Sequence, residues 1–425
     1  MLIKRGYKAE LDLNNEQVTL CRKHCGAARW AYNYGLRRKQ EAYKSGFPVP
    51  SAADLHREIN VLKKTEIPWM YEVSKCAPQE ALRDLDTAFK NFFRKVELKK
   101  QGKWKGKCGY PKFKSKKKAI GGARFTGSIH VYPDAIQLPR LGLLRLKEHD
   151  YLPMNVKIGS ATISEKAGRW YVSICVHEEQ TEPTQATGEP LGIDLGIKKL
   201  ATVSDGRTFD NPKAFRKKLT ALKRVSRRHS RKQKGSQNRQ KAKLRLTRMH
   251  ARIANIRKDA LHKATSAIIA RTKPDAERPA VIVLEDLNIS GMLKNRKLSR
   301  AIADVGMYEF RRQIEYKACE ASVQVKIISR WEPTSKTCSC CGWVKEDLTL
   351  ADRMFICEDC GSIQDRDYNA ARNIAALSVE TTASSAGSDA CGDHVRPGIP
   401  GSDRLKQEPI CMMENGVPTE VLACP

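Results

Sequence analysis

Two Cys-x-x-Cys pairs lie close together in the last third of the chain and limit how that region can fold. Fifteen residues separate the pairs, whose members are Cys338, Cys341, Cys357 and Cys360. Each pair turns two sulfur atoms toward one point, and four thiolates satisfy the tetrahedral coordination of structural zinc. We therefore predict a zinc ribbon over residues 334–363. A closed four-thiolate site leaves no open position for a substrate, so we expect this zinc to stabilise the fold and not to catalyse.

The charge of the chain favours a polyanionic partner. Its 425 residues include 78 Lys and Arg against 47 Asp and Glu, which gives a formal net charge of +31. Such an excess normally marks a surface that binds nucleic acid. The sequence opens without an apolar signal core and has no run of about 18 apolar residues that would span a bilayer. We expect a soluble protein of the prokaryotic cytosol or nucleoid, with no membrane partner.

Two basic segments are candidate nucleic-acid contacts. Between Asp210 and Asp259 the chain has no acidic residue, and its sparse apolar stripe predicts a basic helical hairpin over residues 213–272. The stretch "GKWKGKCGYPKFKSKKK" places aromatic rings among lysines, which is typical either of a solvated loop or of a backbone clamp with stacking rings; we favour the clamp. The candidate contacts in these segments are Trp104, Tyr110, Lys112, Arg227, Arg228 and Arg231.

The pattern of the chain predicts several domains. Residues 11–101 have helical spacing, with Asn15 as a plausible helix cap. Residues 102–182 alternate as strands do, and we expect them to form a small β-barrel with the strand at residues 1–10. Residues 183–190 are expected to be a linker, and the Ser-, Gly- and Pro-rich residues 379–425 a flexible tail.

Acidic residues follow two predicted strands of the second half. Asp194 ends the strand in "PLGIDLG", and Glu285 ends the buried strand in "PAVIVLEDLNIS". A further strand, "SVQVKIISR", and a helix led by Asp367 complete the order of an RNase H-like sheet over residues 191–333 and 364–378. In that fold carboxylates from distant segments converge on divalent cations, and two Mg²⁺ ions bound by oxygen ligands suit phosphodiester hydrolysis. Asp365 is the alternative to Asp367, but its position favours a turn or capping role.

The motifs "LGIDLGIKKLATV", "VIVLEDLNI", the two Cys-x-x-Cys pairs and "DRDYNAARNI" occur in the order found in TnpB, and the chain resembles that family over most of its length. TnpB proteins are transposon-encoded RNA-guided nucleases related to type V CRISPR effectors. The resemblance implies a multidomain α/β and α+β protein with a RuvC nuclease domain, a zinc ribbon, a β-barrel wedge domain and a helical recognition domain. It also implies a guide RNA, a double-stranded DNA target beside a short flanking motif, and catalytic, Mg²⁺-binding acids at Asp194, Glu285 and Asp367.

The helix that reads the flanking motif in this family corresponds to "SKCAPQEALRDL", where Lys75 and Gln79 share one face. Cys76 and Pro78 depart from the family's pattern, so the motif preference does not transfer. Three other hypotheses compete with a guided nuclease: a nuclease-inactive RNA-guided repressor, a protein-guided transposase, and a zinc-ribbon nucleic-acid-binding protein without catalysis.

Overall fold

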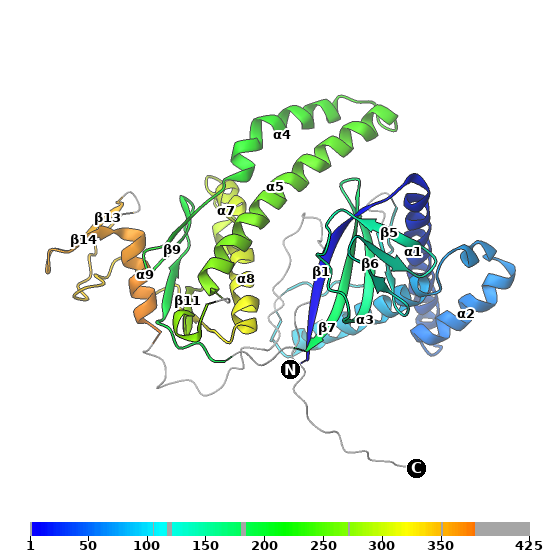
Figure 1. Cartoon of the computed structure of the whole chain (residues 1–425), viewed down its shortest axis with the longest axis horizontal. Coiled ribbons are helices and arrows are strands. Elements are labelled where there is room, and N and C mark those ends of the chain that lie inside the picture. Colours follow the sequence, from blue (N-terminus) through cyan, green and yellow to red (C-terminus); the bar gives the residue numbers. More distant parts are fainter. Residues whose placement is uncertain are drawn as a thin grey trace, which may run out of the picture. The chain divides into compact units, whose positions relative to one another are not determined.

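The computed structural model describes residues 2–104, 106–116, 121–179, 184–270, 273–349 and 352–378. The tail expected at residues 379–425 lies outside the described residues. The described residues divide into two compact units, one up to residue 179 and one from residue 184 to residue 378 (Figure 1). In the described part of the chain, no helix has the length and apolar character needed to cross a membrane.

The first unit is built on an antiparallel sheet of seven strands in the order β2-β6-β7-β1-β5-β4-β3. Among the described residues no ladder joins the two end strands, β2 and β3, so the sheet stays open where we expected a barrel. Strand β3 has two residues, and its ladder among the described residues is with β4 alone. The strands are β1 (Leu2–Asp12), β2 (Gly122–Phe125), β3 (His130–Val131), β4 (Ala135–Leu138), β5 (Gly142–Leu146), β6 (Lys157–Lys166) and β7 (Arg169–Glu179).

Three α-helices and one short 3₁₀-helix complete the first unit. They are α1 (Asn15–Lys44), α2 (Ala52–Thr65), η1 (Pro68–Glu72) and α3 (Cys76–Lys100). The cap of α1 is Asn14 and not Asn15, because Asn14 and Gln17 exchange hydrogen bonds between side chain and backbone in both directions. This reciprocal pair is a capping box, which satisfies two backbone groups that the helix itself leaves unpaired.

A buried histidine connects α1 to the residue that precedes the cap of α3. The Nε2 atom of His24 accepts a hydrogen bond from the Ser74 backbone N–H at 3.0 Å, and its Nδ1 lies 2.8 Å from the Leu20 carbonyl. An imidazole that accepts at one nitrogen and donates at the other is neutral. Burial lowers the pKa of His24, so protonation opposes folding.

His24 should make the stability of the first unit sensitive to acid. The folded-state pKa lies below the unfolded value of about 6.5, so the stabilisation is complete above that pH and is lost as pH falls through the folded pKa. We expect the melting temperature of the wild type to fall more steeply between about pH 7 and pH 5 than that of His24→Gln, whose amide oxygen can still accept the Ser74 N–H. Thermal unfolding over a pH series measures both slopes, and equal slopes would contradict the expectation.

The second unit contains a mixed five-stranded sheet in the order β10-β9-β8-β11-β12. Strands β8, β11 and β12 run parallel to one another, whereas β9 pairs antiparallel with β8 and β10. The strands are β8 (Leu191–Asp194), β9 (Lys199–Val203), β10 (Thr208–Asp210), β11 (Val281–Glu285) and β12 (Gln324–Ile328).

Helices cover both faces of this sheet (Figure 1). On one face, Ile282 and Leu284 of β11 pack in a core with residues of α5 (Gln237–Ile269) and α8 (Met307–Glu320). On the other, Val283 packs with Ile374 of α9 (Arg366–Ala376). The alternation along β11 is that of a strand buried on both sides.

A basic helical hairpin belongs to the same unit. Helix α4 (Ala214–Ser230) runs beside α5 in Figure 1, and the turn between them contains Gly235 at φ +88°. The N-terminus of α4 has no cap of its own. Instead the buried carboxylate of Asp304, on α7 (Ser299–Val305), accepts the backbone N–H groups of Phe215 and Arg216 and pairs with Arg257 of α5 at 3.3 Å. A carboxylate at a helix N-terminus also complements the helix dipole, so Asp304 anchors the base of the hairpin.

The expected linker residues are bound to the second unit. Arg278 donates to the carbonyl oxygens of Thr184 and Ala321 at 3.0 and 2.9 Å, and its own carbonyl accepts the Gly188 N–H at 2.9 Å. Ala186 is buried in the core. The described residues from 184 onward therefore extend the second unit. Its remaining elements are η2 (Asp275–Glu277), α6 (Ile289–Met292), β13 (Met354–Ile356) and β14 (Ile363–Asp365).

Candidate active site

The strand register places two of the predicted acids side by side. Strands β8 and β11 are parallel neighbours in which Leu284 lies opposite Ile193. Asp194 and Glu285 each follow one residue later, at the carboxyl ends of their strands. Because side chains alternate along a strand, both acids lie on the face opposite the Ile193 and Leu284 core, which is the face that α9 covers.

The third acid is brought to this face by close packing of α9. A Cβ atom added at Gly192 would lie 2.1 Å from the Ala371 carbonyl oxygen and 2.3 Å from the Ala375 nitrogen. Only glycine permits so close an approach of helix and strand. Asp367 lies in the first turn of α9, and the helix thus carries it to the ends of β8 and β11.

The electrostatics of Asp194 show that the three acids form one group. Burial, together with the negative charges of Asp367 and Glu285, raises the pKa of Asp194 to about 7. A rise of this kind is typical of a buried carboxylate that has other carboxylates nearby, as at many functional sites. The guanidinium of Arg366 opposes it and also lies 3.4 Å from Asp367. A cluster of oxygen ligands with excess negative charge fits a hard divalent cation.

Asp365 has the capping role that its position indicated. Its Oδ1 accepts the backbone N–H groups of Asp367 and Tyr368 at 2.9 and 3.2 Å, and its other oxygen lies 3.7 Å from Lys199 Nζ. These contacts occupy the Asp365 carboxylate at the start of α9. The carboxylate that influences Asp194 is that of Asp367.

Glu285 and the adjacent Asp286 have different partners. The Thr334 hydroxyl donates to Glu285 Oε1 at 2.7 Å. Asp286 instead pairs with two guanidinium groups, those of Arg311 at 3.1 Å and of Arg330. The charge of Asp286 is therefore neutralised within the protein, whereas that of Glu285 contributes to the acid group.

The four predicted zinc ligands form a compact cluster. The sulfur atoms of Cys338, Cys341, Cys357 and Cys360 all lie within 4.8 Å of one another. Among the described residues, no other group of three or more His, Cys, Asp or Glu side chains meets this limit. The Cys338–Cys360 and Cys341–Cys357 distances are 3.7 and 3.5 Å. A tetrahedral site with Zn–S bonds of about 2.3 Å has sulfur–sulfur edges of about 3.8 Å. The cluster therefore fits a zinc ion, and Cys340 is exposed outside it.

Two asparagines of α9 join this cluster to the acid group, and sequence reasoning missed them. Asn369, fully buried, accepts the Ser339 N–H at 2.9 Å and donates to the Thr337 carbonyl at 2.7 Å. Asn373 donates to the carbonyls of Thr334 and Thr337. Asparagine is a poor residue for a helix interior, so two of them four residues apart in an Ala-rich helix were the available signal.

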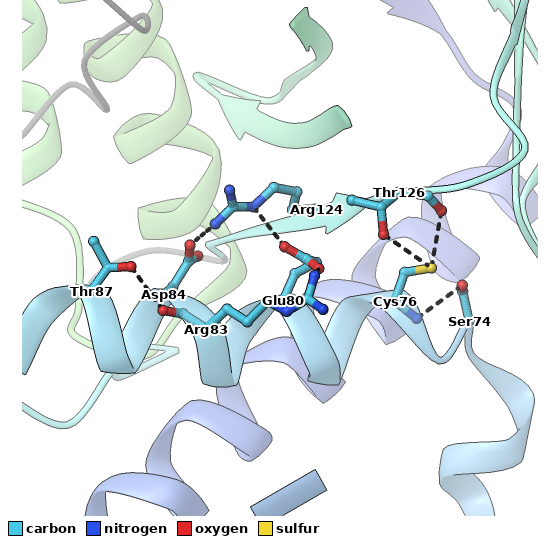
Figure 2. Close-up of polar contacts among 8 residues, drawn as sticks. All are labelled: Ser74, Cys76, Glu80, Arg83, Asp84, Thr87, Arg124 and Thr126. Carbon is cyan, nitrogen blue, oxygen red and sulfur yellow. Dashed lines mark hydrogen bonds and ion pairs between the residues drawn. The ribbon is translucent and has the colours of Figure 1, made fainter. Parts of the chain in front are cut away.

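The expected motif-reading residues lie at the start of α3. Lys75 is exposed and Gln79 half-buried, one turn apart. Cys76 and Pro78, the departures from the family's pattern, are both buried. The Cys76 thiol donates a hydrogen bond to the Thr126 carbonyl oxygen at 3.2 Å (Figure 2). The departures therefore affect how α3 packs and not its exposed surface.

Figure 2 also shows the charged contacts of the next turns of α3. Glu80, which is buried, pairs with Arg83 at 2.6 Å and with Arg124 of β2 at 3.6 Å. Arg124 also contacts Asp84. This network attaches the helix to the edge of the sheet.

The other predicted contact residues are exposed, with one exception. Trp104 is half-buried under Lys95, whose Nζ lies 5.4 Å from the ring, and its indole N–H is buried. This packing leaves Trp104 poorly placed to stack on a base. Tyr110 is 42 % exposed and packs edge-on against Phe89 and Phe92. The remaining exposed candidates are Lys112, Arg227, Arg228 and Arg231.

Three family profiles match parts of the chain. Residues 173–296 match OrfB_IS605, described as a probable transposase, and residues 308–374 match the Cas12f1-like TNB domain. Residues 1–46 match a profile described as a helix-turn-helix domain, but its described residues form β1 and the single helix α1.

Relatives match over nearly the whole chain. A Streptomyces pristinaespiralis protein provisionally named RNA-guided DNA endonuclease is 35% identical over 96% of both chains. An Escherichia coli K12 protein with the same provisional name, InsQ, is 32% identical over 96% of this chain and 98% of its own. The structure of a Cas12f1–guide RNA–target DNA complex aligns with a TM-score of 0.50 at 16% identity, covering 84% of this chain and 82% of that one, which shows a shared fold.

These similarities define a transposon-associated protein with the Cas12f-like fold. The chain belongs to the TnpB family.

Proposed function

We propose that this protein is an RNA-guided endonuclease that cuts double-stranded DNA beside a short flanking motif. The observation that carries the proposal is the acid group: carboxylates from β8, β11 and α9 come together where burial and the charges of Asp367 and Glu285 raise the pKa of Asp194 to about 7. In this proposal the five-stranded sheet is an RNase H-like sheet of the RuvC type, and Asp194, Glu285 and Asp367 are the catalytic residues.

The acid group would hold two Mg²⁺ ions, which prefer carboxylate oxygens as ligands. Mg²⁺ bound there would activate water and stabilise the oxygen that leaves when a phosphodiester is hydrolysed. The contribution of the chain is to fix the ligands in place. The Thr334 hydroxyl orients Glu285, and the Asp365 cap holds the helix turn that carries Asp367.

The four thiolates would hold a structural zinc ion. Because Asn369 and Asn373 bond the ribbon to α9, the ribbon would fix the helix that carries Asp367. Zinc at this site would thus support catalysis without taking part in it.

The two units would share the binding of nucleic acid. We assign β1 and the other strands of the first unit to a wedge domain, its helices to a recognition domain, and the basic hairpin to phosphate contacts. Lysine and arginine contacts to phosphates carry no sequence information, so base pairing with a guide RNA would supply it. Lys75 and Gln79 are the residues we propose for reading the flanking motif.

Exchange of the guide tests this proposal. Protein purified with its RNA should cut one DNA target in Mg²⁺, and a new terminal guide segment should move cutting to the matching DNA beside the same motif. Removal of the RNA should abolish specific cutting. The measurement is the position of cleavage in a set of DNA targets.

Two outcomes would favour the alternatives. Cutting of one fixed sequence by RNA-free protein, whatever guide is supplied, would indicate a protein-guided transposase. Guided binding without cutting in Mg²⁺ would indicate a repressor. A Mg²⁺-free reaction with chelator is the matched control for both experiments.

A further inference from the structure

An exposed tryptophan lies in the segment that connects β12 to the cysteine cluster. Trp331 is 86 % exposed, more than any other large apolar side chain in the described residues. A tryptophan buries a large apolar area when it finds a partner, so an almost fully exposed ring is available to bind one.

The segment around Trp331 is held in place on both sides by the acid region. Arg330 pairs with Asp286, the residue next to Glu285. Thr334 donates to Glu285 itself at 2.7 Å. Within the segment, the Trp331 N–H donates to the Ser329 hydroxyl at 3.3 Å. The exposure of the ring therefore comes from an anchored turn.

The length of the chain limits how far this ring can lie from the acids. Three residues span at most about 11 Å when fully extended, so the Trp331 Cα lies within about that distance of the Thr334 Cα. A nucleic-acid strand advances about 3.4 Å per stacked nucleotide. A strand whose phosphate is held at Glu285 thus has bases within reach of the ring.

We propose that Trp331 stacks on a base of the DNA strand that is cut and holds the scissile phosphate at the acid group. The inference rests on the proposed function. The three carboxylates offer nothing that binds a base, and they repel a phosphate unless cations intervene. An aromatic ring supplies grip on a single strand without choosing its sequence, which suits an enzyme whose target is chosen by base pairing.

The test combines variants of Trp331 with targets that lack one base. In guided complexes, Trp331→Ala should lower the single-turnover cleavage rate about 5- to 100-fold, and Trp331→Phe should restore most of it. One abasic position near the cut should lower the cleavage rate of the wild type by a similar factor. The same abasic position should lower the cleavage rate of Trp331→Ala only slightly further. Guide and target binding should stay unchanged. Tyr308→Ala, which removes a ring 50 % exposed on α8, is the control and should show no coupling to any abasic position.

The inference would be overturned if Trp331→Ala cut at the wild-type rate. It would also be overturned if every abasic position lowered the cleavage rates of both proteins by the same factor. Either result would leave the proposed function intact. A second measurement does not depend on cleavage. Single-stranded DNA containing 2-aminopurine should be quenched by the wild type and not by Trp331→Ala. Equal quenching by the two proteins would overturn the inference, whether or not the wild type cuts DNA. Absence of cleavage by the wild type would instead count against the proposed function. Equal melting temperatures would show that the variants fold.

Discussion

Asp194→Ala, Glu285→Ala and Asp367→Ala should each bind guide RNA and target DNA and cut that DNA at least about 10³ times more slowly than the wild type. Each variant would remove a proposed carboxylate ligand of the cations that activate water. Single-turnover cleavage and a binding assay in the same buffer measure the two effects. Cleavage at the wild-type rate by any one variant would remove that residue from the site.

A substitution at this site should raise the stability of the protein while it abolishes cleavage. The burial of Asp194 and the charges of Asp367 and Glu285 oppose its ionisation, so Asp194→Asn removes a desolvation cost and a repulsion that the free protein has to accommodate. We expect Asp194→Asn to melt at a higher temperature than the wild type in chelator, while its cleavage is lost. A lower melting temperature would mean that the Asp194 carboxylate stabilises the fold.

Asp365→Asn is the matched control for these variants. It alters a carboxylate two residues from Asp367, but asparagine is as good a helix cap as aspartate. We expect most of the cleavage activity to remain. If Asp365→Asn alone abolished cutting, the assignment of Asp367 would be wrong.

The second large effect is expected from loss of zinc. Structural zinc contributes about 10 kcal/mol or more to the folding of a small site, so Cys360→Ser should lose the metal and unfold the ribbon locally. Because Asn369 and Asn373 join the ribbon to α9, cleavage should fall at least about 10-fold, the usual effect of losing an outer support of a metal site. Metal analysis by mass spectrometry, limited proteolysis and cleavage rates measure the three consequences.

Cys340→Ser tests whether the effect belongs to the cluster. Cys340 lies in the same ribbon, but its thiol is exposed outside the group of four. This variant should keep one zinc ion and its activity. Asn369→Leu should keep the zinc and lose activity, because it breaks the connection without touching a ligand. Fully active wild-type protein without zinc would reject the site.

The sequence was most informative where a local pattern determines the structure. Asp194 and Glu285 end apolar runs, and parallel strands bring their carboxyl ends to one edge of a sheet, so their meeting could be expected. The Cys-x-x-Cys spacing likewise predicted which thiols gather. The choice of Asp365 as a cap followed from its place just before a helix.

Contacts between distant segments could not be read in this way. Thr334 meets Glu285 across 49 residues, and Asp304 caps a helix that begins about 90 residues earlier. Neither residue has a local pattern that sets it apart from an ordinary surface threonine or aspartate. Trp104 is a case in which the local pattern was misleading. Its aromatic and basic neighbours indicated a free ring, whereas Lys95 and Gly106 pack against it.

The close packing of α9 on Gly192 also determines when the proposed nuclease centre can form during synthesis of the chain. Asp367 lies 173 residues after Asp194, and a ribosome adds about 5–20 residues per second. Asp194 therefore leaves the ribosome roughly 10–35 s before the residue that completes its site. During that interval the first unit can already fold, while the nascent chain still lacks the complete acid group that we propose cuts DNA.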